Sequence, residues 1–206
     1  MCWNEHVSLN TYLFSMGMLG LLIYNNKYTP YKVAGFNGYW YFFIISFCTM
    51  QLIEYFLWRN LDNKKMNYLF SAAGQGLVAI QPVASLFLLQ NATLRNVMLL
   101  LYVLFVGIIS TTQKKVFKTS TENGHLKWSW VPLKTYQFFV WLFFVLFSFV
   151  VNKYYVALAV AIFLFYITYN TEGTGGSVWC WTINFSMIFY AIYLLIYLPL
   201  KEKKVC

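Results

Sequence analysis

Charged side chains are scarce in this sequence. Only 10% of its 206 residues are Asp, Glu, Lys or Arg, whereas soluble globular domains carry about 25%. Hydrophobic residues make up 60% of the chain and aromatic residues 22%. This composition excludes a soluble globular protein and leaves no stretch polar enough to form a separate soluble domain. It predicts a single integral membrane domain over residues 1–206.

Histidine, cysteine and aspartate are also rare, and their scarcity excludes several chemistries. There are two histidines, His6 and His125, and four cysteines that form no Cys-x-x-Cys pair. Zinc and haem sites need richer ligand sets, so we expect no metal and no cofactor. Asp62 is the only aspartate, which rules out a catalytic aspartate pair. The last apolar segment has no lysine to carry retinal, so we expect no retinal binding. We assign no catalytic residues.

The few acids are outnumbered by bases. Six Asp and Glu stand against 15 Lys and Arg, which gives a net charge of +9. The bases fall in the connections between apolar segments and in the C-terminal tail, a pattern that predicts contact with anionic lipid headgroups. We expect no nucleic-acid binding, because no soluble domain exists to carry it. The bases divide almost evenly between the two sides of the membrane and do not indicate an orientation.

Long apolar runs are abundant. A membrane-spanning helix needs about 20 mostly apolar residues, and seven segments approach or exceed that length. They lie at about 7–24, 39–58, 67–89, 94–112, 135–152, 154–170 and 177–198. The pattern predicts an all-α membrane protein, a seven-transmembrane-helix bundle, in which the fourth and most uniformly apolar segment faces lipid.

Residues 116–131, between the fourth and fifth segments, have the pattern of a β-hairpin. Asn123-Gly124 is the dipeptide preferred in a type I′ turn. A two-residue loop at this position places Thr119 opposite Trp128. It also places three apolar side chains on one face: Leu126, Trp128 and Trp130. We expect this face to lie on the mouth of the bundle or on the headgroups; a solvated loop is the alternative.

The second segment holds an acid. Gln51, Glu54 and Trp58 follow i, i+3, i+7 spacing and therefore share one helical face. A charged residue at the centre of a membrane costs about 2.5–3.5 kcal/mol on insertion scales, and less near the interface. We expect this face to point into protein or water. In the alternative, Glu54 sits at the headgroups and pairs with Arg59.

The third segment carries a stripe of small and polar residues, which is typical of the interior side of a membrane helix. Its members recur at steps of three and four: Ser71, Gly74, Val78, Gln81 and Ser85. Pro82 lacks a backbone N–H, so we expect it to kink the helix and to free a carbonyl that needs another partner.

The candidate site consists of polar and tryptophan side chains in or beside the spans. They are Gln51, Glu54, Gln75, Gln81, Glu172, Trp179, Cys180, Trp181 and Asn184. In one interpretation they line a common cavity, where Glu54 couples to an ion or proton while Gln81 and Asn184 bind a solute. In the other they tie helices together, each hydrogen bond contributing about 0.6 kcal/mol.

Three short motifs stand out: Met1-Cys2-Trp3-Asn4 at the start, Gln51-Leu52-Ile53-Glu54 in the second segment, and Trp179-Cys180-Trp181 in the last. They resemble an uncharacterised multi-pass membrane protein family of large DNA viruses and protists. The resemblance covers the layout of most of the chain, but only these motifs specifically. It implies a seven-span integral membrane protein with no known activity, and it points at Glu5, Glu54, Glu172 and the Trp/Cys cluster.

Three functions fit these features. The first is a small transporter or channel for an ion or small solute, with a polar intramembrane site around Glu54. The alternative is a membrane-embedded lipid-modifying enzyme that uses Cys180 or Glu54, and the second alternative is an architectural membrane protein of a virus or organelle. The ending Lys203-Lys204-Val205-Cys206 matches the two-lysine pattern of endoplasmic-reticulum retrieval signals, which suggests a host or endoplasmic-reticulum membrane; a chance basic tail explains it equally well.

Overall fold

The computed structural model of the chain describes residues 4–30, 32–33, 36–112, 116–130, 136–155, 158–159, 162–163, 166 and 185–203. These residues are mostly helical and include one two-stranded sheet. Four helices are long and apolar enough to cross a membrane: α1 (Glu5–Tyr28), α2 (Gly38–Arg59), α3 (Lys64–Leu86) and α4 (Ala92–Thr112). Two further apolar helices are shorter, α5 (Tyr136–Val151) and Phe185–Lys201, and the second overlaps η1 (Tyr193–Tyr197) and α8 (Leu198–Lys203).

These helices bear out the membrane class and the first four predicted segments. Predicted and observed ends differ by at most four residues in α1 to α4. The segment 154–170 lies largely outside the described residues, as does the first part of 177–198. A count of seven spans therefore stays a prediction.

An asparagine stands at the start of each of the four long helices. Its side-chain oxygen accepts a backbone N–H of the first turn, which would otherwise have no partner. The four pairs are Asn4 with Val7 (2.9 Å), Asn37 with Tyr39 (3.0 Å), Asn63 with Met66 (3.2 Å) and Asn91 with Leu94 (3.0 Å).

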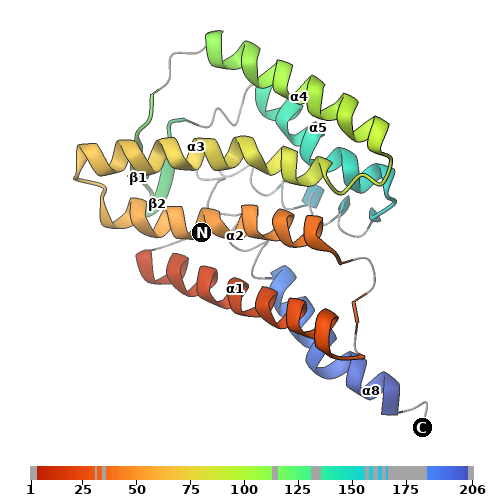
Figure 1. Cartoon of the computed structure of the whole chain (residues 1–206). Helices are drawn as coiled ribbons and strands as arrows, with labels where there is room; N and C mark the ends of the chain where they lie inside the picture. Colours follow the sequence, from red (N-terminus) through yellow and green to blue (C-terminus); the bar gives the residue numbers. More distant parts are fainter. Residues whose placement is uncertain are drawn as a thin grey trace.

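Helix α3 lies at the centre of the molecule, with α1 and α2 on one side of it and α4 and α5 on the other (Figure 1). Its stripe of small and polar residues faces this interior as predicted, since Ser71, Gly74, Gln81 and Ser85 are all buried. Several side-chain bonds join the C-terminal half of α3 to its neighbours, among them Gln81 Nε2 to the Ser46 carbonyl (3.3 Å), Tyr102 Oη to the Ala79 carbonyl (2.8 Å) and Ser85 Oγ with Ser148 Oγ (2.7 Å).

The carbonyl that Pro82 leaves free has a partner. Residue 82 would normally donate to the carbonyl four residues earlier, which belongs to Val78. Trp141 of α5 donates its indole N–H to that oxygen at 2.8 Å. The helix continues through Pro82, and the expectation of a partner inside the bundle is confirmed.

The β-hairpin is confirmed, with β1 (Thr119–Glu122) antiparallel to β2 (His125–Trp128). Thr119 pairs with Trp128, the predicted register. The turn residues Asn123 and Gly124 have φ of 51° and 76°, the positive values that a type I′ turn requires. Figure 1 shows the hairpin at the end of the bundle where α2 ends and α3 begins.

Candidate functional site

The side chains of Gln51 and Glu54 are both 0% exposed. They lie on one face of α2 together with Trp58, which is half-buried. Glu54 is five residues from the end of the helix, so at ~1.5 Å per residue it lies roughly 7 to 8 Å inside that end. The prediction that this face points away from lipid is confirmed.

The same face of α2 continues into the main apolar core. Phe47, four residues before Gln51, is buried with Phe138 and Trp141 of α5 and with Met187 of the last helix. The spacing 47, 51, 54, 58 follows one side of a helix. Gln51 and Glu54 are therefore the polar continuation of a core stripe, and they face the interior of the bundle.

Helix α1 runs antiparallel to α2 and brings hydroxyl groups to the same level. Glu5 of α1 pairs with Arg59 of α2 at 3.7 Å, and Asn26 donates to the Tyr41 hydroxyl at 3.1 Å. Between these two contacts, Glu54 falls at about the level of Thr11. Three side chains on this stretch of α1 are buried: Ser8, Thr11 and Ser15.

These hydroxyls are the part of the site that the sequence reasoning missed. Ser8, Thr11 and Ser15 are spaced i, i+3, i+7, so a polar stripe was visible in the sequence. What was not visible is that folding buries this stripe at the level of Gln51 and Glu54, some 40 positions away in the sequence. The candidate site is thus Gln51 and Glu54 of α2, at a level where α1 also buries Ser8 and Thr11; we call these four residues the polar layer.

Arg59 does not hold Glu54 at the headgroups. The Arg59 side chain is 57% exposed, pairs with Glu5 and donates to the Tyr55 hydroxyl at 2.9 Å. Glu54 is fully buried on a different face of the helix. The alternative in which Glu54 pairs with Arg59 is therefore wrong.

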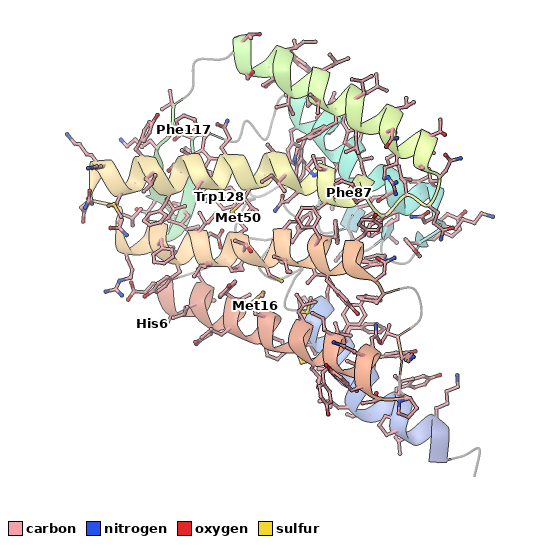
Figure 2. All side chains as sticks on the ribbon, viewed as in Figure 1. His6, Met16, Met50, Phe87, Phe117 and Trp128 are labelled. Atoms are coloured by element: carbon pink, nitrogen blue, oxygen red, sulfur yellow. The ribbon has the colours of Figure 1, made fainter. Side chains whose placement is uncertain are left out.

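The hairpin lies against α3, and its Trp130 comes close to the segment of α2 that carries Glu54. Trp130 contacts α3 at Gly74, where a Cβ atom would come within 2.8 Å of the indole ring and 3.5 Å of Ile53. Ile53 is the residue next to Glu54. Figure 2 shows His6 of α1, and Phe117 and Trp128 of the hairpin segment, at this same end of the molecule.

The structure does not bring the predicted glutamine of the α3 stripe to the acid. Gln81 donates to the carbonyl of Ser46, which lies eight residues from Glu54, or about 12 Å along α2. Gln75 is half-buried, one residue from Gly74. The remaining site predictions, Glu172, Trp179, Cys180, Trp181 and Asn184, lie outside the described residues.

The chemistry available at the polar layer is that of one carboxyl group. A carboxyl group takes up and releases one proton, and its neutral form both donates and accepts a hydrogen bond. Its charged form is costly in a low-dielectric interior unless a cation or several donors compensate. Within the described ranges no three His, Cys, Asp or Glu residues gather as metal ligands would.

Comparison with known proteins adds no family to this description. No family model, no curated protein and no solved structure matches the chain.

Proposed function

We propose that this chain is a multi-pass membrane protein that moves a proton or a small cation across the bilayer, with Glu54 as the coupling group. In this proposal seven helices form the bundle, membrane lipids surround it, and Gln51 with the α1 hydroxyls completes the polar layer around the acid. The permeant species binds or releases at the Glu54 carboxylate as the carboxyl group changes its protonation state.

The observation that carries this proposal is the complete burial of Glu54 inside a helix long enough to span a membrane. Acids in such helices are costly, and those that are kept usually mark ion or proton pathways. Gln51 and the hydroxyls of Ser8 and Thr11 are buried at the same end of the α1–α2 pair. Buried polar groups at the level of the acid support an ion or proton site there.

A second candidate, an architectural membrane protein, is favoured by a different observation. Gln81 and Ser85 bond to neighbouring helices, as polar groups do when they only tie a bundle together. This candidate assigns Glu54 the same role as those groups. The two candidates therefore differ in what the carboxyl group of Glu54 contributes.

Flux measurements on the purified protein in sealed vesicles test the proposal. Proton, sodium and potassium flux would be followed under imposed gradients, for the wild type, for Glu54→Gln and for empty vesicles. We expect wild-type flux of at least one ion above empty vesicles and its loss in Glu54→Gln. The matched control is Glu122→Gln, which removes an acid paired with Lys127 on the outer face of the hairpin and should leave flux unchanged.

Equal flux in the wild type, in Glu54→Gln and in empty vesicles would leave the architectural candidate.

A further inference from the structure

Among the described residues, the hydrogen bonds that attach the hairpin to α3 all involve Thr119. Asn67 uses both ends of its side-chain amide: its Oδ1 accepts from the Thr119 N–H at 2.9 Å, and its Nδ2 donates to the Thr119 carbonyl at 2.9 Å. The Thr119 hydroxyl lies 2.8 Å from that of Ser71 and accepts from the Trp130 indole N–H at 3.1 Å. We call these four residues, Asn67, Ser71, Thr119 and Trp130, the latch.

The latch is buried and satisfied. Its four residues are between 0% and 5% exposed, and each bond joins the hairpin to α3 or holds the hairpin together. A buried polar network of this kind fixes one docking position and disfavours neighbouring ones. The hairpin therefore sits in a defined place on α3 and does not simply lie on the bundle surface.

Gly74 leaves the space that is occupied by Trp130, the largest side chain of the latch; we call this space the Gly74 socket. The Trp130 ring occupies the space where a side chain at position 74 would be, 2.8 Å from the expected Cβ. The Trp130 ring is held to the hairpin, because it is bonded to Thr119 and stacked on Trp128 at 4.8 Å. By contrast, a Cβ at Gly76, on the exposed side of the same helix, would meet no described atom within 4 Å.

The docked hairpin also contains a buried polar group that has no hydrogen-bond partner among the described residues. The indole nitrogen of Trp128 is buried and has no hydrogen-bond partner in the described part of the chain. A buried donor without an acceptor favours the state in which it reaches water. The strands are bonded to each other, and their outer face carries polar residues such as Glu122 and Lys127, so the hairpin can leave α3 as a unit.

We propose that the hairpin is the gate of the Glu54 site: docked on α3 it closes this end of the bundle, and when the latch opens it admits water and ions to Glu54. The inference rests on the proposed function, because it assigns a gate to the same carboxyl group. Its support is the position of Trp130, which shares the Gly74 socket with Ile53, the residue next to Glu54. Glu54 is completely buried although it lies less than two turns from the end of α2.

Thiol labelling tests the gate without any transport measurement. The four native cysteines are replaced by alanine, Glu54→Cys supplies one thiol, and the full chain is placed in nanodiscs, where a water-soluble maleimide reaches both membrane faces. We expect slow labelling in this parent. Adding Gly74→Leu, which displaces Trp130, should accelerate labelling about tenfold or more, since labelling of a closed site follows its opening equilibrium.

Gly76→Leu is the matched control, because it adds the same side chain two residues away where the structure has room. It should label at the parent rate. Should Gly74→Leu fail to elute as a folded protein, Thr119→Val takes its place, since it removes the latch hydroxyl and keeps the size of the side chain. Fast labelling in the parent would refute the proposed gate. Equal labelling rates in Gly74→Leu and Gly76→Leu would refute it too, provided that fluorescence shows Trp130 to be displaced in Gly74→Leu.

A reversible lock separates failure of the gate from failure of the proposed function. With Glu54 intact, Ser71→Cys and Thr119→Cys place two thiols where hydroxyls lie 2.8 Å apart. Oxidation should abolish ion flux and reduction should restore it. Flux that continues through the oxidised protein overturns the gate alone. No flux from the wild type, combined with faster labelling in Gly74→Leu, overturns the proposed function and leaves the hairpin as a cap over Glu54.

Discussion

At the scale of single residues, the buried polar groups occupy positions where a neighbouring group needs a partner. The sequence predicted that the carbonyl freed by Pro82 would be bonded, because proline always leaves such a group. It did not indicate that Trp141 would be the donor, since the contact joins residues 63 positions apart. The same holds for Asn67 and Thr119, which are 52 positions apart.

Replacing Trp141 tests this pairing. Trp141→Phe removes the donor to Val78 and should lower the free energy of unfolding in detergent by about 1–2 kcal/mol, the cost of an unpaired buried acceptor in a membrane protein. Pro82→Ala returns a backbone N–H to the same carbonyl. In the Pro82→Ala background, Trp141→Phe should lower the free energy of unfolding only by the part that is due to lost packing. Equal costs in both backgrounds would show that the Trp141–Val78 bond contributes nothing.

At the scale of elements, local patterns predicted what each segment would become. Helical periodicity placed Gln51 and Glu54 on one buried face, and Asn-Gly placed the hairpin turn. Patterns of this kind depend on residues within a few positions of each other. The docking of the hairpin on α3 depends on the Gly74 socket and on Asn67, and neither has a signature that names Trp130 or Thr119 as its partner. The asparagine caps were readable in the sequence and would have improved the predicted helix starts.

Two glycine substitutions compare the turn with the helix. Gly124 has a φ of 76°, where a side chain is strained, so Gly124→Ala should destabilise the hairpin by about 1 kcal/mol. Gly76 lies inside α3 with room for a methyl group, so Gly76→Ala should be neutral or stabilise by about 0.5–1 kcal/mol. Thermal unfolding in detergent measures both. Equal effects would contradict the assigned turn conformation.

At the scale of the whole molecule, the outer surface is apolar where lipid is expected. Helix α4 turns mostly exposed apolar side chains outward, among them Leu100 (61%), Leu104 (54%) and Ile108 (65%). Composition predicted this class of protein because a water-soluble chain could not bear such a surface. The arrangement of the helices around α3 could not be predicted, because each apolar segment could pack against several other segments that are equally apolar.

Spin labels in a bilayer test the assignment of this surface. Labels at Leu100 and Leu104 should collide with oxygen, which concentrates in lipid, and should be shielded from a water-soluble nickel complex. A label at Thr121, exposed on the hairpin, should show the reverse. Strong nickel collisions at both α4 positions would mean that α4 does not face lipid.

The carboxyl group of Glu54 is central to the proposed function, and its most direct test compares ion flux through the wild type, Glu54→Asp and Glu54→Gln in the same vesicles. Asp keeps the acid on a shorter side chain, whereas Gln keeps the shape and loses the acid. We predict reduced flux in Glu54→Asp and none above empty vesicles in Glu54→Gln. Wild-type flux in Glu54→Gln would contradict the account, because the shape of the side chain and not its proton chemistry would then be what matters.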